Sequence, residues 1–293
     1  MLRRFWTTGT GVAPTPRGTS GPHSTGREEE DALELRTRCF GRPLLHFSRL
    51  PSTSTTVAGF GRRGTPEGLA VWADEQSAGR GRLGRSWFSP RGQGVWLSVL
   101  LRPPLPAEQI PRTSLAAGLA VARSVFRATG IRCGLKWPND VMLRGRKVAG
   151  VLAEAYQVDR QIGFVVLGVG VNLTVADWPP ELLGVGTSLA AEGTPVRPAH
   201  LVPVLLEELE RDYSRLLAGQ WDKLRAEWRA ASVTMGRPVI ARGPAGELAG
   251  RARDLGPAGE LMLERDDGTL VAVVAGDVSL SQGVSVNDDH SVP

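Results

Sequence analysis

The sequence predicts an α+β protein in two parts, and three observations carry this prediction. Residues 44–173 hold several strand-like apolar runs and one long helical pattern, and two amphipathic helical stretches follow in residues 202–228. After Met235 the sequence changes to short strand-like runs separated by turns. We therefore expect a domain of helices and strands followed by a small all-β domain.

The elements of the larger part follow from the spacing of apolar residues. A helix should begin at Pro111 and end at Gly130, because its apolar residues recur at helical spacing and glycine suits a C-cap. Strands are predicted at residues 44–50, 69–73, 95–101, 148–155 and 161–173, and a short helix at 53–59. The last of these strands is almost continuously apolar, which predicts that it is buried.

The residues after Met235 predict a small antiparallel barrel. Short strands are expected at residues 238–241, 247–254, 261–265 and 270–277, with Gly-Pro or Asp-Gly turns between them. A unit of this size has little independent stability, so it should dock on the larger domain.

The net charge of +5 does not indicate a nucleic-acid-binding protein. Residues 1–27 contain four arginines and no acidic residue, which leaves only +1 for the rest of the chain. A nucleic-acid-binding domain normally carries a basic face. We expect no specific DNA binding, and the first 40 residues show no pattern for a helix-turn-helix module. No apolar run approaches the ~20 residues of a membrane-spanning helix, so we expect no membrane partner.

The chain has two cysteines, Cys39 and Cys133, and four scattered histidines. They predict neither a disulfide framework nor a zinc site, because the required ligand spacing is absent. Free thiols are typical of a reducing compartment, so a cytoplasmic location is expected.

The first 40 residues are rich in Thr, Gly, Pro, Ser and Arg, which predicts disorder. Their opening faintly resembles an organelle transit peptide; a misplaced start codon or a bacterial extension is the favoured alternative. The predicted parts are a disordered extension at residues 1–40, the larger domain at 41–233, the barrel at 234–283 and a flexible tail at 284–293.

The strongest motif is the Gly/Arg-rich segment at residues 79–87. Glycines let a backbone approach a ligand closely, and guanidinium groups donate paired hydrogen bonds to carboxylate or phosphate. A solvated basic turn is the alternative, and this segment alone leaves both open.

A second polar cluster, Lys-Trp-Pro-Asn-Asp at residues 136–140, is expected at a strand end. ATP chemistry needs a cation for phosphate and a carboxylate for Mg²⁺, and Lys136 and Asp140 supply both. A capped turn remains the alternative for Asn139, and it is a weaker explanation for Lys136 and Asp140.

Two further motifs lie on predicted strands. Lys147 opens an apolar strand, where its ammonium would pair with an anion, although an ordinary surface lysine is the alternative. Gly168 and Gly170 precede Asn172 in a buried strand, which indicates either close approach of a ligand or tight sheet packing. A dinucleotide-binding fingerprint is excluded, because the third glycine and the following helix are missing.

In this order and spacing, the four motifs resemble those of the biotin protein ligases: GRGRxGRxW, KWPND, KxAGxLxE and GxGxN. The resemblance runs from about Leu44 to Ser281, and lipoate protein ligases lack the first two motifs. It implies a mixed, mostly antiparallel sheet with flanking helices, as in class II synthetases, and a C-terminal SH3-like barrel. It also implies a monofunctional enzyme that activates biotin with ATP and transfers it to a carrier lysine.

The resemblance implies site residues position by position. Biotin would contact Ser52, Thr53, Ser54, Gln76, Arg80, Gly81, Arg82 and Lys147. The nucleotide would contact Arg82, Lys136, Asn139 and Asn172. The catalytic residues would be Lys147, Arg82 and Asp140, the last also a weak ligand of Mg²⁺. Ser54 stands where the family has asparagine, and neighbouring threonines leave the register of this motif open by a residue or two. An adenine-covering segment would fall in residues 178–189, without a recognisable motif.

The implied cofactors are ATP and Mg²⁺, and the implied partners are biotin and the biotin carboxyl carrier protein of a carboxylase, with a homodimer possible. Arginines, lysines and Mg²⁺ would offset the repulsion between the biotin carboxylate and the phosphates. The rival interpretations are a ligase for lipoate or another acid, a biotin-responsive repressor, and a pure biotin-binding module.

Overall fold

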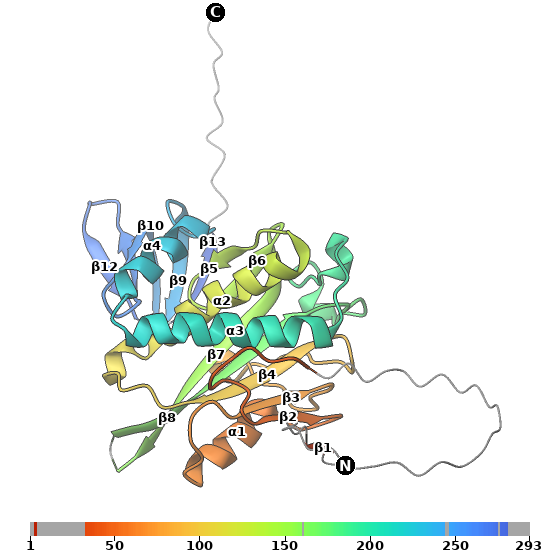
Figure 1. Cartoon of the computed structure of the whole chain (residues 1–293). Coiled ribbons are helices and arrows are strands. Elements are labelled where there is room, and N and C mark those ends of the chain that lie inside the picture. The colour runs from red at the N-terminus through yellow and green to blue at the C-terminus, as the bar shows by residue number, and fades with distance from the viewer. Residues whose placement is uncertain (1–2, 5–32, 160, 244–245, 275, 281–293) are drawn as a thin grey trace, which may run out of the picture.

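The computed structural model describes residues 3–4, 33–159, 161–243, 246–274 and 276–280. Figure 1 shows one large sheet with helices on its two faces and a smaller sheet beside it. Most of the predicted N-terminal extension and all of the predicted tail lie outside the described residues. In the described part, no helix is long and apolar enough to cross a membrane.

The large sheet has eight strands, and all neighbours are antiparallel except the parallel pair of β2 and β3. In sheet order the strands are β1 (Arg3–Arg4), β2 (Leu44–Phe47), β3 (Ala70–Ala73), β4 (Gly94–Leu101), β8 (Gln161–Asn172), β7 (Arg146–Val158), β6 (Asp140–Leu143) and β5 (Gly134–Lys136). This arrangement confirms the expected mixed, mostly antiparallel sheet.

Side chains that alternate along β8 enter two separate cores. Val165 and Leu167 belong to the core that α2 (Pro111–Thr129) and α3 (Pro198–Leu217) cover. Phe164 and Val166 belong to the core under α1 (Thr53–Arg62), on the opposite face. The nearly continuous apolar run of this strand is explained, because both of its faces are buried.

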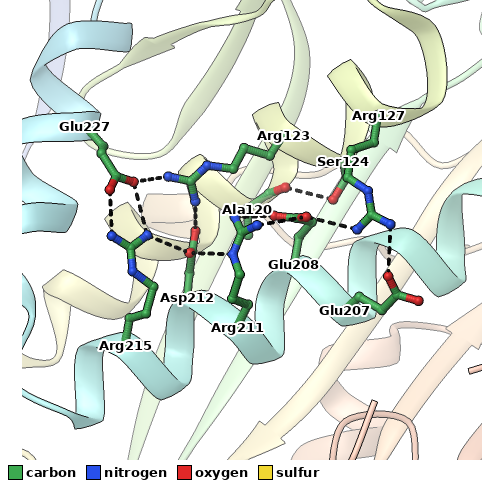
Figure 2. A network of polar contacts seen from close by, with 10 residues as sticks. All are labelled: Ala120, Arg123, Ser124, Arg127, Glu207, Glu208, Arg211, Asp212, Arg215 and Glu227. Atoms are coloured by element: carbon green, nitrogen blue, oxygen red, sulfur yellow. Dashed lines mark hydrogen bonds and ion pairs between the residues drawn. The ribbon is translucent and has the colours of Figure 1, made fainter. Parts of the chain in front are cut away.

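A network of ion pairs joins α2, α3 and α4 (Trp221–Ala231), as Figure 2 shows. Asp212 is fully buried, and its carboxylate pairs with Arg123 and, at 3.2 Å, with Arg215. Arg215 also donates to Glu227 of α4 at 2.6 Å. Since every charge that is removed from water here has a partner of opposite sign, the network fixes how the three helices pack.

The C-terminal sheet has five antiparallel strands and docks on the larger domain, as expected. In sheet order the strands are β12 (Leu270–Val273), β11 (Leu261–Glu264), β10 (Gly246–Leu255), β9 (Pro238–Gly243) and β13 (Asp277–Leu280). The indole Nε1 of Trp137 donates to the carbonyl of Gly259 at 3.0 Å, and Arg225 donates to the carbonyl of Leu255 at 3.0 Å. The single strand expected at residues 270–277 is in fact two strands, which pair with different neighbours.

The folded chain begins earlier than the predicted start at residue 41. Phe40 is 1% exposed in the main core, and the backbone N–H groups of Arg38 and Cys39 donate to Glu210 of α3 at 2.8 and 2.6 Å. Leu33, Leu35 and Cys39 also pack against the main core and alternate with the exposed Glu34, Arg36 and Arg38. The prediction of disorder missed this short alternation, because it ends a stretch that is otherwise rich in Thr, Gly, Pro, Ser and Arg.

Candidate functional site

A cavity of about 770 Å³ lies between the large sheet, the loop at residues 79–87 and the C-terminal sheet. Its size is that of a small-molecule site. Residues from all four sequence motifs line it, together with the first turn of α1 and the start of β13.

The glycines of β8 make room for this cavity. Gly168 and Gly170 share a face with Val166, which α1 covers further along the strand. A Cβ at Gly170 would lie 2.4 Å from the indole Nε1 of Trp87, and one at Gly168 would lie 2.8 Å from Ser54 Oγ. These glycines accommodate neighbouring side chains, which agrees with tight packing, and they also line the cavity, where close approach of a ligand stays a prediction.

A chain of hydrogen-bonded side chains lines the cavity at the first turn of α1. Gln76 Oε1 accepts from both the backbone N–H and the hydroxyl of Thr53, at 2.8 and 3.1 Å. Thr53 has thereby used its proton, so Ser98 must donate to Thr53 across 2.8 Å. Ser54 must in turn donate to Ser98 across 3.0 Å. The hydroxyl protons of Thr53, Ser98 and Ser54 are therefore all used in hydrogen bonds among these side chains and Gln76. This hydroxyl chain can offer a ligand only acceptor lone pairs.

Ser98 is absent from the residues expected at the site, and Ser52 lies elsewhere than expected. Ser98 is a fully buried polar residue in the otherwise apolar strand β4, which is the signal that could have identified it. Ser52 is the N-cap of α1, where its hydroxyl accepts from the N–H of Thr55 at 3.4 Å, and it does not line the cavity.

A second group of side chains carries the positive charge. Lys147 at the start of β7 lies with its Nζ 2.5 Å from Asp140 Oδ1 of β6, and its ammonium stands over the ring of Trp87 at 5.1 Å. Lys136 lines the same cavity from β5. Both lysines thus reach the space that an anionic ligand could enter.

The Gly/Arg loop folds back on itself over the cavity. The N–H of Trp87 donates to the carbonyl of Gly79 at 2.9 Å, which closes the loop at its base. Arg80 forms an ion pair with Glu154 of β7, whose pKa is raised by burial against the opposing effect of Arg80. Burial lowers the pKa of Arg82, which lines the cavity with Gly81 and Arg85.

The two asparagines of the motifs hold backbone segments that line the cavity. Asn139 donates to the carbonyl of Val151 at 2.6 Å, which ties the β5–β6 turn to β7. Asn172 donates to the carbonyl of Thr187 at 3.1 Å. The same segment is held by the backbone N–H of Lys147, which donates to the carbonyl of Val185 at 2.8 Å. The apolar lining of this segment comes from Trp178, Leu182 and Val185.

The site therefore has two parts. The hydroxyl groups of Thr53, Ser54 and Ser98 offer acceptor lone pairs, and Lys136 and Lys147 offer positive charge. The indole of Trp87, which lies beneath the ammonium of Lys147, also lines the cavity. Among the described residues, no group of three His, Cys, Asp or Glu side chains could hold a metal ion by itself.

Comparisons with known proteins agree with this arrangement. Residues 46–172 match the biotin/lipoate A/B protein ligase family, and residues 234–281 match the biotin protein ligase C-terminal domain. The bifunctional ligase/repressor BirA of Bacillus subtilis is 32% identical over 86% of this chain and 78% of its own length. The biotin–[acetyl-CoA-carboxylase] ligase of Mycobacterium tuberculosis is 41% identical over 72% of this chain and 79% of its own. The biotin protein ligase of Aquifex aeolicus, solved with biotin and ATP, is 25% identical and superposes with a TM-score of 0.72 over 82% of this chain and 99% of its own. On the motifs, the fold and these similarities, the chain belongs to the biotin protein ligase family.

Proposed function

We propose that this protein activates biotin with ATP to biotinyl-5′-AMP and transfers biotin to a lysine of a carrier protein. The observation that carries the proposal is the pairing, within one cavity, of a hydroxyl chain that offers acceptors with lysines and arginines that attract anions. Biotin has complementary groups, since its ureido ring donates two N–H bonds and its valeryl chain ends in a carboxylate.

The hydroxyl chain favours biotin over lipoate or a simple alkyl acid. Thr53, Ser54 and Ser98 each keep a free lone pair and no free proton. A dithiolane or alkyl group would leave the remaining lone pairs unused, and would lose the about 0.5–1.5 kcal/mol that each hydrogen bond from a ureido N–H would add. A site that binds polar groups discriminates strongly against a ligand that lacks them. Ser54, although shorter than the asparagine of the family, is part of this hydroxyl chain.

In the first step, a carboxylate oxygen of biotin attacks the α-phosphorus of ATP. A new P–O bond forms to the acyl oxygen, the bond to the β-phosphate breaks, and pyrophosphate leaves with the electron pair. Lys147, Lys136 and Arg82 line the cavity and offset the repulsion between the two anions. Asp140, 2.5 Å from the ammonium of Lys147, holds that ammonium at the wall of the cavity.

In the second step, the amine of the carrier lysine attacks the acyl carbon of the mixed anhydride. An amide bond forms, the bond to the AMP oxygen breaks, and the amine loses a proton. Because the anhydride also reacts with water, the loop at residues 79–87 would protect it by lying over the cavity.

We also propose that Mg²⁺ enters the site with ATP. Mg²⁺ in nucleotide sites retains waters and takes one or two protein carboxylates, and Asp140 is a carboxylate that lines this cavity. When bound, the ion would neutralise phosphate charge. The lack of a three-ligand cluster among the described residues fits an ion held mainly by ATP and water.

For partners, we propose the biotin carboxyl carrier protein of a carboxylase and no specific DNA. The first proposal is supported by relatives named ligases of acetyl-CoA carboxylase. The second is supported by the net charge of +1 outside residues 1–27, although some relatives are named ligase/repressor. We propose residues 33–233 as the catalytic domain, since Phe40 lies in its core, and residues 234–283 as the barrel domain.

The transfer reaction tests this proposal. The full chain is incubated with biotin, ATP, Mg²⁺ and a carrier domain, and the carrier is analysed by mass spectrometry. We expect one carrier lysine to gain a biotinyl group, with one AMP and one pyrophosphate formed per transfer. A carrier with that lysine replaced by arginine is the control. An unmodified wild-type carrier, or modification that does not require ATP, would contradict the proposal.

A further inference from the structure

Asp277, the first residue of β13, contacts two arginines of the Gly/Arg loop from the other domain. Its Oδ2 lies 2.5 Å from Arg85 Nη2, and its Oδ1 lies 3.3 Å from Arg82 Nη1. The neighbouring Gly276 accepts a hydrogen bond from Arg82 Nη2 on its carbonyl at 3.0 Å. One short stretch of the C-terminal sheet thus holds two of the three arginines in residues 80–85.

The local backbone fixes this contact. Gly276 has φ +143°, and a Cβ there would lie 2.3 Å from the carbonyl oxygen of Arg242, so only glycine fits without displacement. Asp277 is paired with Arg242 in the register of β13 and β9. The carboxylate is therefore presented by the first residue of a paired strand, and the carbonyl by the glycine that directly precedes it.

Apart from Asp277 and Gly276, the tip of the loop is held by its own backbone hydrogen bonds and by a 3.4 Å contact from Arg82 to Asn139. Leu83 is 66% exposed and has φ 54°, a left-handed conformation that side-chain-bearing residues rarely adopt, and Gly84 follows with φ 74°. Arg82 and Arg85 repel each other, and Arg82 is largely withdrawn from water, so it needs an opposite charge. Asp277 supplies that charge for both arginines.

We propose that Asp277 is a positioning residue that ties the Gly/Arg loop to the C-terminal domain and so retains the activated acyl intermediate in the cavity. Through this contact the barrel takes part in catalysis without touching the reacting atoms. The retention of the intermediate rests on the proposed function, whereas the holding of the loop does not.

The proposal predicts opposite effects on two quantities. Without the carboxylate, the loop opens more often, so more intermediate escapes. At the same time ATP should bind at least as well, because its phosphates no longer compete with Asp277 for Arg82 and Arg85. A variant that was merely misfolded would bind ATP less well, so this combination separates positioning from general damage.

The test compares Asp277→Asn, Asp277→Glu and the control Glu264→Gln in the full chain. Glu264 forms an ion pair with Arg253 in the same sheet and does not line the cavity. Three measurements are made: the rate of trypsin cutting after Arg82 and Arg85 without ligands, the biotinyl-5′-AMP recovered in an ultrafiltrate after reaction with biotin and MgATP, and the KM for ATP. Thermal unfolding shows that each variant is folded.

In Asp277→Asn we expect about fivefold faster cutting and about fivefold more free intermediate, as for the loss of a partly exposed ion pair. The KM for ATP should be unchanged or lower, Asp277→Glu should recover part of the effect, and Glu264→Gln should behave as wild type. The proposal would be overturned if Asp277→Asn matched Glu264→Gln in its rate of trypsin cutting and in its release of biotinyl-5′-AMP. A raised KM for ATP in Asp277→Asn would overturn it as well. If wild type forms no adenylate, the proposed function fails, and the trypsin rates alone decide whether Asp277 holds the loop.

Discussion

The ammonium of Lys147 and the carboxylate of Asp140 lie 2.5 Å apart on the adjacent strands β7 and β6. The sequence assigned these residues to different ligands, biotin and Mg²⁺, yet in the folded chain they form one pair at the wall of the cavity. Asp140 therefore sets the position of the Lys147 ammonium, which in the proposed function contacts the carboxylate of biotin.

Replacing Lys147 with methionine should weaken biotin binding by about 1.5–3 kcal/mol, the usual contribution of a hydrogen bond to a charged group. The rate of adenylation should fall further, since Lys147 also offsets charge during the attack on ATP. Isothermal titration with biotin measures the first effect and pyrophosphate release the second. Lys223→Met, an exposed lysine on α4, is the matched control. Unchanged affinity together with an unchanged rate would remove Lys147 from the site.

Replacing Ser98 with alanine should weaken biotin binding by about 1–3 kcal/mol. The change removes the donor to Thr53 and leaves the proton of Ser54 without its acceptor, so the hydroxyl chain loses its order. Ser124→Ala is the control, because Ser124 is an equally buried hydroxyl that bonds to the carbonyl of Ala120 within α2. Both variants should lose some stability, but only Ser98→Ala should lose affinity for biotin. If Ser98→Ala and Ser124→Ala bound biotin with equal affinity, the hydroxyl chain would not bind the ureido ring of biotin.

Much of the fold is predictable because its signals are local. Gly130 does end α2 in the left-handed conformation, with φ 74°, and the apolar run of β8 does lie between two cores. The strands β5 and β6 were not predicted by range, although the motif at residues 136–140 was expected at a strand end and Lys136 does end β5. Residues 33–40 were expected to be disordered because of the composition of the first 40 residues, although Leu33 and Leu35 pack against the core and Arg38 and Cys39 donate to Glu210.

The site is predictable only where a motif marks it. Gln76, Thr53 and Lys147, which lie in or beside a recognisable pattern, do line the cavity, while their contacts with biotin stay a prediction. Asp277 lies 195 residues after Arg82 in the chain, and no short-range pattern connects the two. Pairings of this kind depend on how the C-terminal sheet docks, which becomes visible only in the folded structure.

Replacing Asp212 with alanine should destabilise the protein by about 3–5 kcal/mol, the usual cost of breaking a buried ion pair. Arg123 and Arg215 would lose a shared carboxylate between α2 and α3. Urea unfolding measures the change. Arg253→Gln, which breaks an exposed pair with Glu264, should cost no more than about 1 kcal/mol. If both variants lost the same free energy of unfolding, the buried ion pairs of Asp212 would contribute no more to stability than an exposed pair does.

The same network predicts an acid dependence of stability. The hydrogen bond from Arg215 is the main cause that lowers the pKa of Glu227. Because the folded pKa lies below the unfolded value of about 4.3, the contribution of Glu227 is present above that value and is lost as the pH falls through the folded pKa. Glu227→Gln should thus be less stable than wild type at pH 7, with the difference shrinking towards pH 3. A difference in urea midpoint that stays constant across this range would contradict the assignment.

The central claim is that the cavity selects biotin and activates it with ATP. The most direct measurement is isotope exchange between ATP and pyrophosphate, run on the full chain with biotin, lipoate or octanoate as the only added acid. We predict exchange that depends on biotin and is far slower with lipoate and octanoate, because only biotin brings donors to the hydroxyl chain of Thr53, Ser54 and Ser98. Exchange supported by lipoate or octanoate and not by biotin would contradict the account.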